Sequence, residues 1–416
     1  MAAVRQLLPR RTTDRVLAAL EDTRVVLLNG ARQSGKSTLV RQVGFATGAT
    51  WYSLDDAITR KHAAEDPHEF VRLNPRMIID EIQRDTELLL SIKSLVDEVP
   101  TPGRFLLTGS ARIMGMSSLP DTLVGRMETI ELWPLSQGEI DNKFDRFIDA
   151  AFALGPELRH ESEITRDDYI ARIVRGGFPE VIHRTPERRS AFFKNYVSDI
   201  INRDVIQLGD IERGKQMREL VKLVAGGSGQ VISARGFSSD LGISAETVSR
   251  YLALLEEVFL IKRIPAWTRR ISNRSVKQDK IAFVDSGIAS ALLGQTSSRL
   301  RKPGAPLGPL LEGFVAMEIA RQLTWSKTDA TMSHYRTRDG DEVDIVLEND
   351  IGEVIGIEVK ASSSPKPEDF RGLHHLQSRL GDDFVAGYVL HTGAHTFSAG
   401  PKMKSVPISA LWQVAG

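Results

Sequence analysis

The feature that most constrains the fold is a glycine-rich segment that follows a short apolar run near the N-terminus. Residues 24–29 read Arg-Val-Val-Leu-Leu-Asn, and residues 30–38 then fit the pattern G-x-x-x-x-G-K-[ST]. In such a segment the backbone N–H groups and the start of a helix face one anion together, so a buried strand must end where a helix begins. The sequence therefore predicts a strand, a phosphate-binding loop and a helix, in this order.

The predicted loop supplies the contacts for ATP phosphates and one ligand for Mg²⁺. Lys36 is expected to reach the β- and γ-phosphates, and the hydroxyl of Ser37 is expected to ligate Mg²⁺. A chance glycine-rich turn is the alternative, but the flanking strand and helix patterns argue against it. The residues expected to contact the nucleotide are Gly30, Ala31, Arg32, Gln33, Ser34, Gly35, Lys36, Ser37 and Thr38.

Four more short apolar runs follow, and helix-length segments separate them. This alternation is typical of a parallel sheet that is covered by helices. We therefore predict a P-loop α/β domain over residues 1–135. The runs lie at residues 49–54, 76–80, 104–109 and 127–132.

An acidic pair, Asp80 and Glu81, ends the run at residues 76–80. Ligands of open α/β sheets bind at the carboxyl ends of strands, so both side chains are expected to face the phosphates. Asp80 is predicted to hold Mg²⁺, and Glu81 to polarise the water that attacks the γ-phosphate. The alternative is a helix N-cap, which an acidic residue after a strand commonly forms.

Hydroxyl and guanidinium side chains complete the predicted catalytic set. Thr108 and Ser110 end the next run and are candidates for orienting the attacking water, with an ordinary capped turn as the alternative. Arg112 and Arg126 are candidates for the arginine that stabilises transition-state charge, either in the same chain or in a neighbouring one. A plain surface role is the alternative for both arginines.

Composition restricts the partners that the chain as a whole attracts. Lys plus Arg total 54 and Asp plus Glu total 54, so no global field draws nucleic acid or membrane, and any such binding depends on local patches. There is no cysteine, which excludes disulfides and thiolate-held metals. Because no apolar stretch is long enough to span a bilayer and no signal peptide is visible, we expect a cytoplasmic protein without a membrane partner.

The middle of the chain is expected to be helical and then to form a winged helix. Residues 136–230 show a helical pattern that the loop at residues 176–180 interrupts, which predicts a lid or connector. Residues 231–298 place two short helices around Gly242, with Ser244 as an N-cap, followed by two candidate wing strands.

A basic arm makes DNA the candidate partner of the winged helix. The segment 262–280 carries seven Lys or Arg residues and one Asp, a local net charge of 7 − 1 = +6. A structural winged helix with a solvated basic loop is the alternative. The side chains that the second helix offers to DNA are Glu246, Thr247, Ser249 and Arg250.

A third set of charged residues lies in the C-terminal region, residues 299–416, which is predicted to be a small α/β domain. Asp344 lies in one expected strand, and Glu358 and Lys360 share one face of the next. Two carboxylates with an ammonium group would hold Mg²⁺ or Mn²⁺ and act on a phosphodiester, with Glu312 as a further acidic ligand. An exposed strand with alternating charges is the alternative.

The motifs together resemble the AAA+ superfamily, and more closely a bacterial and archaeal group in which a small ATPase core precedes a C-terminal domain of uncharacterised function. The resemblance implies ATP binding and hydrolysis, with the middle helices as a lid. One departure is Thr108, which stands where AAA+ proteins carry a sensor asparagine. The C-terminal pattern resembles the restriction-endonuclease-like core. The segments that carry both resemblances are residues 28–38, 79–83, 107–112, 131–136, 176–180, 341–344 and 358–360.

Three hypotheses for function follow. The first is a Mg²⁺-dependent ATPase that controls a DNA-contacting winged helix and a metal-dependent nuclease domain, with a homo-oligomer as a candidate assembly. The second is an ATP-driven switch that binds DNA or protein without nuclease chemistry. The third, a small-molecule or nucleotide kinase, shares the phosphate loop but has no need of the acidic pair or of the further domains.

Overall fold

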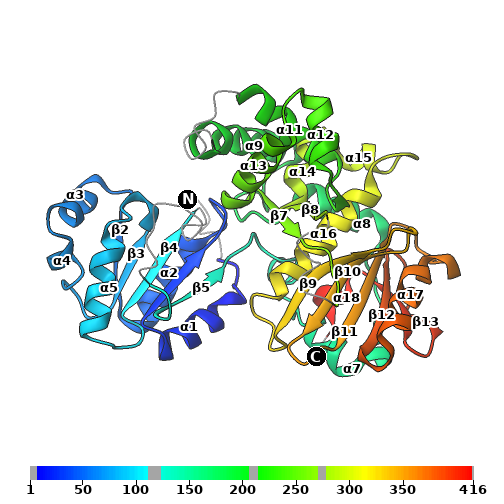
Figure 1. The fold of residues 1–416 in the computed structure, drawn as a ribbon, viewed down its shortest axis with the longest axis horizontal. Helices are drawn as coiled ribbons and strands as arrows, with labels where there is room; N and C mark the ends of the chain where they lie inside the picture. The colour runs from blue at the N-terminus through cyan, green and yellow to red at the C-terminus, as the bar shows by residue number, and fades with distance from the viewer. Residues whose placement is uncertain (1–6, 111–122, 206–213, 270–277, 415–416) are drawn as a thin grey trace. The chain divides into compact units, whose positions relative to one another are not determined.

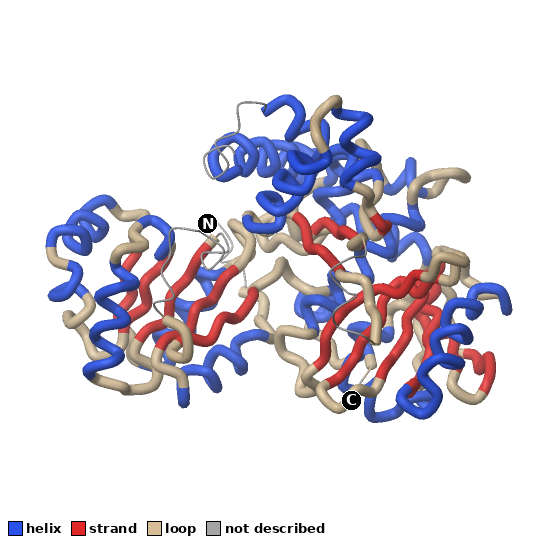
Figure 2. The backbone as a smooth tube through the Cα atoms, in the orientation of Figure 1, coloured by secondary structure: helices blue, strands red, loops and turns tan. Residues whose placement is uncertain are grey.

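The computed structural model describes residues 7–110, 123–205, 214–269 and 278–414. The chain forms two compact units (Figures 1 and 2). Unit 1 comprises residues 1–134 with 257–259, and unit 2 comprises residues 135–256 with 260–416. The boundaries that the sequence predicts at residues 230 and 298 lie inside unit 2, where the middle and C-terminal regions pack together.

Unit 1 is built on a five-stranded sheet in the order β2-β3-β4-β1-β5. All neighbouring strands in this sheet are parallel. Every residue of β1, β3 and β4 is buried, as expected for strands that are covered on both faces. The strands are β1 (Val25–Asn29), β2 (Thr50–Ser53), β3 (Met77–Asp80), β4 (Phe105–Gly109) and β5 (Met127–Glu131).

Helices cover both faces of this sheet (Figure 1). Alternate residues of one strand point to opposite faces, so Leu27 joins the core that contains Ile92, while Leu28 joins the core that contains Leu39. The predicted α/β class with a parallel sheet is thus confirmed. The helices are α1 (Thr12–Asp22), α2 (Lys36–Thr47), α3 (Ala57–Glu65), α4 (Pro67–Phe70), the short η1 (Ile82–Arg84) and α5 (Leu88–Glu98).

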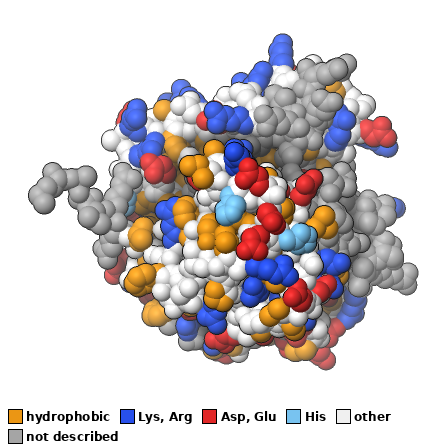
Figure 3. All heavy atoms as spheres, turned by 90° about the vertical axis from the view of Figure 1, so that its left-hand side faces the viewer, with side chains coloured by type: hydrophobic (Ala, Val, Ile, Leu, Met, Phe, Trp, Pro, Cys, Tyr) orange, Lys and Arg blue, Asp and Glu red, His pale blue; other side chains and the backbone are white. Residues whose placement is uncertain are grey.

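The surface of unit 1 carries charges of both signs. On the face that Figure 3 shows, acidic, basic and hydrophobic side chains are interspersed. Several surface cations pair with acids, as in the Arg72–Glu98 and Arg84–Asp55 pairs. This mixture agrees with the equal numbers of acidic and basic residues in the chain.

Unit 2 begins with a helical region. Its helix α8 starts with a capping box in which Thr165 and Asp168 exchange hydrogen bonds. The region contains α6 (Gln137–Asp141), α7 (Phe147–Leu154), α8 (Arg166–Arg175), α9 (Pro186–Asp199), the π-helix η4 (Ile200–Val205) and α11 (Gly214–Gly226).

The two short helices that the sequence predicts around Gly242 are present, together with a three-stranded sheet in the place of the expected wing. The helices α12 (Ala234–Leu241) and α13 (Ala245–Glu257) flank Gly242, whose left-handed φ of 61° ends α12. The hydroxyl of Ser244 accepts a hydrogen bond from the N–H of Thr247 and so caps α13. The strands β6 (Gln230–Val231), β7 (Ile261–Ile264) and β8 (Lys280–Phe283) pair antiparallel in the order β6-β8-β7.

The C-terminal region forms a six-stranded mixed sheet in the order β13-β14-β12-β11-β10-β9. The helix α16 is buried along most of its length, which explains why apolar residues occur on all of its sides. The two strands that were expected to carry Asp344 and Glu358 are present as β10 and β11, whereas β13 and β14 were not predicted. The strands are β9 (Ala330–Arg336), β10 (Glu342–Asn349), β11 (Val354–Lys360), β12 (Phe384–His391), β13 (Phe397–Gly400) and β14 (Met403–Pro407). The helices that follow β8 in the chain are α14 (Ser286–Leu292), α15 (Ser297–Leu300), α16 (Leu307–Gln322), α17 (Arg371–Leu380) and α18 (Ala410–Gln413).

Across the described ranges, none of the helices is both long and apolar enough to cross a membrane.

Candidate functional site

Strand order brings the predicted catalytic residues of unit 1 to one edge of the sheet. The glycine-rich loop follows β1, and the acidic pair ends β3. The strand β4 lies between β1 and β3 and ends in Thr108 and Gly109, followed by Ser110. Residues from three neighbouring strand ends therefore face one place, which is where open parallel sheets bind ligands.

The loop between β1 and α2 requires its glycines for two different reasons. A Cβ atom on Gly30 would overlap the backbone carbonyl of Leu132, so only glycine allows this close approach. Gly35 precedes α2 with a left-handed φ of 101°. The buried Oγ of Ser34 and Oδ1 of Asn29 have no hydrogen-bond partner within the described part of the chain, which fits a loop that is completed by a polar ligand.

Lys36 lies inside the loop with its ammonium group turned toward backbone carbonyls. Its Nζ donates to the carbonyl oxygens of Gly30 and Ala31, each at 2.9 Å. Burial lowers the pKa of Lys36 to about 8, although Glu81 and Asp80 favour the charged form. A buried ammonium group with two weakly basic acceptors would gain strongly from a phosphate, which fits the predicted role of Lys36.

Asp80 is held by hydroxyl groups from two other segments. The Oγ of Ser37 donates to Asp80 Oδ1 at 3.2 Å, and the hydroxyl of Thr108 donates to the same oxygen. The Thr108 hydroxyl also accepts a hydrogen bond of 3.0 Å from the N–H of Glu81. Thr108 therefore positions both acidic residues, and its hydroxyl is engaged by protein groups on both sides.

Glu81 is held in an unusual backbone conformation. Its φ of 62° and ψ of 47° lie in the left-handed region, which a non-glycine residue adopts only at a cost of about 1–3 kcal/mol. Its Oε2 accepts hydrogen bonds from Ser110, at 3.0 Å, and from Gln83. Backbone strain of this kind concentrates at functional sites, and here it fixes the direction of the carboxylate beside the loop. The role of Gln83 was not predicted.

The residues at this edge fit a Mg²⁺–nucleotide complex. Mg²⁺ in such sites takes one or two protein oxygens and completes its shell with phosphate oxygens and water. Ser37 and Asp80 provide a hydroxyl and a carboxylate that already contact one another at 3.2 Å. They can therefore both face one small cation next to the loop.

A residue that sequence reasoning missed, Arg10, supports the loop from behind. Its guanidinium group donates to the carbonyl of Ser34 and to the carbonyl of Trp133, both at 2.7 Å. It therefore ties the glycine-rich loop to the segment that follows β5. No local motif marks Arg10, because its partners lie 24 and 123 residues away.

The structure corrects the role that was predicted for Arg126 within its own chain. Arg126 immediately precedes β5, at the amino edge of the parallel sheet and opposite the glycine-rich loop. Its guanidinium group binds both carboxylate oxygens of Asp97. Arg126 therefore does not reach phosphates in this loop, whereas a role toward a neighbouring copy stays a prediction. The other candidate, Arg112, lies outside the described residues.

The charged residues predicted in the C-terminal region do converge, but around a lysine that was not predicted to be there. Lys280, from wing strand β8, is only 2% exposed. Its Nζ contacts Asp344 Oδ1 at 2.6 Å and Glu342 Oε1 at 2.9 Å. The other oxygen of Asp344 accepts a 2.9 Å hydrogen bond from the N–H of Val359. Both oxygens of Asp344 are thus engaged within the protein.

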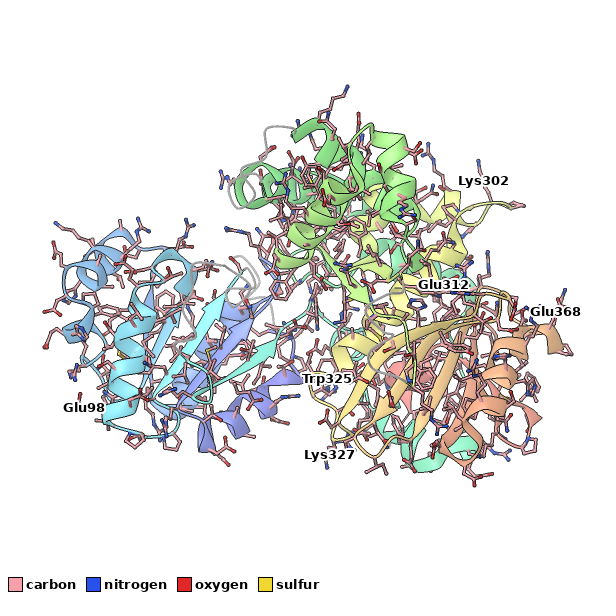
Figure 4. All side chains as sticks on the ribbon, viewed as in Figure 1. Glu98, Lys302, Glu312, Trp325, Lys327 and Glu368 are labelled. Atoms are coloured by element: carbon pink, nitrogen blue, oxygen red, sulfur yellow. The ribbon has the colours of Figure 1, made fainter. Side chains whose placement is uncertain are left out.

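Two further carboxylates border this ion pair. Glu312 lies on α16 (Figure 4), and burial together with the Asp344 carboxylate raises its pKa to about 8. The same two causes raise the pKa of Glu358 to about 8, although its Oε1 pairs with Lys360 at 2.9 Å. The buried Oε2 of Glu358 has no hydrogen-bond partner among the described residues. We call Glu312, Glu342, Asp344 and Glu358 with Lys280 the C-terminal acidic cluster.

This arrangement differs from the predicted Mg²⁺ or Mn²⁺ site at Asp344 and Glu358, because a lysine lies among the carboxylates. Within the described part of the chain, no group of three His, Asp or Glu side chains is placed so that it could hold a metal ion. The physical reason is that the Lys280 ammonium group takes the place of a cation beside Asp344. A metal ion at Asp344 and Glu358 would have to displace this ammonium group, and the metal site stays a prediction.

The raised pKa values predict a pH dependence of stability. The ordinary pKa of a glutamate is 4.5, but Glu312 and Glu358 have a pKa of about 8 in the folded state. Between these two pH values the folded state therefore binds more protons than the unfolded state. The free energy of unfolding should therefore fall as pH rises from 5.5 to 7.5, by about 1.4 kcal/mol per pH unit for each extra proton bound. Urea denaturation at both pH values measures this, and Glu358→Gln should flatten the dependence. An equally steep dependence in Glu358→Gln would contradict the assignment.

The winged helix exposes part of the predicted DNA-contacting surface. Glu246, Ser249 and Arg250 on α13 are exposed, and Thr247 is half-buried. The basic arm is less available than its charge count suggests. Its residues 270–277 lie outside the described ranges, and Lys280 is buried in the C-terminal acidic cluster.

Two more cations of the arm are paired with acids. Arg263 pairs with Asp279 at 2.8 Å, and Arg269 pairs with Asp383. Three of the seven cations of the predicted footprint, Lys280, Arg263 and Arg269, therefore have acidic partners, and DNA binding by the arm stays a prediction.

The loop at residues 176–180, to which no chemistry was assigned, has a structural role. The carboxylate of the fully buried Asp285 accepts from the N–H of Gly177 at 2.5 Å and from the N–H of Gly287 at 2.8 Å. A Cβ atom on Gly176 would overlap Asp285. Glycine at this position therefore lets the loop close against the start of α14.

Comparison with known proteins finds relatives along nearly the whole chain. Uncharacterized proteins of Mycobacterium bovis and Mycobacterium tuberculosis are each 28% identical over 406 residues, which cover 97% of this chain and 84% of each relative. A protein of Haemophilus influenzae is 23% identical over 353 residues, covering 79% of this chain and 83% of the relative.

Two solved structures show limited similarity. The Walker-type ATPase of Pyrococcus abyssi matches with a TM-score of 0.43 and 13% identity, over 69% of this chain and 96% of that one. AMPPCP-bound DnaA of Aquifex aeolicus matches with a TM-score of 0.30 and 14% identity, over 59% of this chain and 86% of that one.

Family models cover three stretches of the chain. Residues 166–299 and 307–411 match domains of unknown function, DUF8612 and DUF4143. These descriptions name no nuclease, so the predicted restriction-endonuclease-like character of the C-terminal region is not supported. Residues 22–141 match a model described as an AAA domain. The glycine-rich loop, Lys36 and the acidic pair all lie within this matched stretch, which is therefore similar to AAA domains.

Proposed function

We propose that the protein is an ATP-driven switch, in which unit 1 hydrolyses ATP with Mg²⁺ and the nucleotide state controls the binding of DNA by unit 2. The observation that carries the proposal is the convergence of Lys36, Ser37, Asp80 and Glu81 at the carboxyl edge of one parallel sheet. These residue types at this place are what phosphoryl transfer to water requires.

Each residue has a separate part in the proposed reaction. Lys36 exchanges its carbonyl partners for phosphate oxygens and stabilises the charge that develops on them. Ser37 and Asp80 would hold Mg²⁺, which when bound neutralises charge on the phosphates. Glu81 orients the attacking water and accepts its proton, and Thr108 keeps Asp80 and Glu81 in place.

ATP binding by full-length protein tests the first part of the proposal. Lys36→Ala removes the buried ammonium group, so the Kd for ATP with Mg²⁺ should rise at least about tenfold, as expected for loss of a charge-assisted hydrogen bond. The exposed residue Lys61, which pairs with Glu65 on α3, supplies the matched control Lys61→Ala. Calorimetric titration measures both variants, and equal ATP affinities would contradict the proposal.

DNA is proposed as the partner of unit 2 on the strength of the winged helix. The exposed side chains of α13 and its capped N-terminus are of the kind that enter a major groove or contact phosphates. Three cations of the basic arm pair with acidic residues, so fewer of them are available to DNA phosphates. The exposed side chains of α13 do not depend on these pairs. Anisotropy of a labelled duplex, measured with and without ATP, tests both the binding and its control by nucleotide.

A metal-dependent nuclease is the second candidate function, and the convergence of Asp344, Glu358 and Glu312 is the observation that favours it. The ion pair of Lys280 with Asp344 favours the switch instead, because it engages the carboxylate that a metal ion would need.

Cleavage assays separate the two candidate functions. Single- and double-stranded DNA should stay intact with wild type in Mn²⁺ or Mg²⁺, as with Glu358→Ala and Lys360→Ala. Cleavage by wild type that disappears in Glu358→Ala would establish the nuclease and overturn this part of the proposal.

A further inference from the structure

Unit 2 contains a second candidate binding site, far in sequence from the phosphate loop. A cavity of about 980 Å³ lies among α8, α9, α14 and the segment 294–301. Its volume is at the upper end of the range that small-molecule sites show. Almost all of its lining falls in residues 166–299, the stretch that matches a domain of unknown function.

The lining of this cavity is strongly basic, although the chain as a whole has no net charge. Six cationic and two acidic side chains line it, a difference of 6 − 2 = +4. The cationic residues are Arg172, Arg175, Arg189, Lys194, Arg299 and Arg301. A concave surface of one sign concentrates field lines and attracts a ligand of the opposite sign.

The two acidic residues of the lining form hydrogen bonds at the N-termini of helices α8 and α9. Asp168 accepts hydrogen bonds from the N–H and the hydroxyl of Thr165 in the capping box of α8. Glu187 lies in the first turn of α9, where hydrogen bonds to the backbone and to Thr185 lower its pKa. Neither carboxylate forms an ion pair with the arginines across the cavity within the described part of the chain.

Two of the arginines, Arg172 and Arg301, have acidic partners outside the lining. Arg172 pairs with Asp141 at 2.8 Å, and Arg301 pairs with Asp167 at 3.0 Å. The other arginines bind only neutral groups among the described residues, and Arg175 is an example. Its Nη2 donates to Gln137 at 2.8 Å, while its buried Nε has no partner.

Arg189 and Arg299 also bind neutral groups among the described residues. Arg189 donates to the carbonyl of Arg184 at 3.0 Å, and Arg299 to the carbonyl of Gly294 at 2.8 Å. Burial lowers the pKa of Arg189, and burial with the nearby Arg172 lowers the pKa of Arg175 to about 10. Partly desolvated guanidinium groups that lie close together are stabilised when an anion takes the place of water.

From these contacts we infer that the cavity binds a small molecule that carries two or more phosphate groups. Guanidinium forks match phosphate oxygens in pairs, so Arg175 and Arg189 are the expected principal contacts. Lys194, which is exposed at the same cavity, adds a point charge. The buried ring of Phe193 and the small residues Gly287 and Ala291 leave apolar room for the remainder of the ligand.

The site is distinct from the phosphate loop, so its test uses full-length protein in a Lys36→Ala background. Calorimetric titration with inorganic pyrophosphate and with ADP gives the affinities. Arg189→Gln should weaken binding at least about tenfold, as for loss of a charge-assisted hydrogen bond. Lys194 is exposed, so Lys194→Gln should leave the fold intact and weaken binding about threefold. The matched control is Arg188→Gln, because Arg188 is exposed on the same helix and does not line the cavity.

Three results would overturn the inference. The first is that neither pyrophosphate nor ADP binds saturably. The second is that Arg189→Gln and Lys194→Gln bind as tightly as Arg188→Gln. The third is that a twelve-nucleotide single strand is the sole ligand that the Arg189→Gln variant binds more weakly, which would assign the surface to a nucleic-acid backbone. A failure of the ATP-binding test at Lys36 leaves all of these readouts unchanged.

Discussion

Replacing Glu81 by glutamine is expected to reduce the turnover of ATP by about 100-fold or more, because loss of a positioned general base typically costs this much. The amide keeps the size of the side chain and its contacts with Ser110 and Gln83, but it cannot take a proton from water. ATP affinity should stay within about twofold of wild type, since Lys36 and the loop supply the binding contacts. Steady-state release of phosphate and calorimetric titration separate the two effects.

The control for this experiment is Glu87→Gln. Glu87 precedes α5 and is exposed, so its amide should leave both turnover and affinity unchanged. If Glu81→Gln weakened ATP binding and turnover in equal proportion, Glu81 would be a structural residue of the loop and not the base. The strained backbone of Glu81, with φ at 62°, would then serve folding alone.

Lys280→Met should destabilise unit 2 by about 3–5 kcal/mol, because removal of one partner leaves a buried charge without compensation. The substitution keeps the length of the side chain while it removes the ammonium group that contacts Asp344 and Glu342. Urea denaturation of full-length protein measures the loss. Adding Asp344→Asn to Lys280→Met should recover part of the stability, since the remaining group is then neutral.

A surface lysine supplies the comparison for Lys280. Lys327 is exposed beyond the end of α16 (Figure 4), and Lys327→Met should change the free energy of unfolding by less than about 0.5 kcal/mol. Equal stabilities of Lys280→Met and Lys327→Met would show that the buried ion pair contributes nothing. The carboxylates of the C-terminal acidic cluster would then be available to a metal ion, as a nuclease requires.

The parts of the fold that could be predicted are those whose signal is local. The apolar runs of unit 1 are continuous and end in glycine or acidic residues, so the strands, the loop at residues 30–38 and the acidic pair follow directly from the sequence. The helix pair around Gly242 could also be predicted, because a capping residue and a left-handed glycine are signals that span only a few positions of the sequence. The strands β13 and β14 carry short, mixed patterns and were missed.

What could not be predicted depends on partners that are distant in the sequence. Lys280 belongs to a basic run, and nothing near it indicates that its ammonium group lies 2.6 Å from Asp344, 64 residues away. A count of charges treats Arg263 and Arg269 as free, whereas both pair with acids. Arg10 is equally inconspicuous. In each case tertiary packing decides whether a charge faces solvent, a ligand or a partner.

ATP hydrolysis by unit 1 is tested by the release of phosphate from ATP by full-length protein, with Mg²⁺ present or chelated. We expect turnover by wild type with Mg²⁺, and its loss when Mg²⁺ is chelated or Lys36 is replaced by alanine. Turnover that persists in Lys36→Ala would contradict it, and so would a wild-type protein that binds ATP with Mg²⁺ but releases no phosphate with or without DNA.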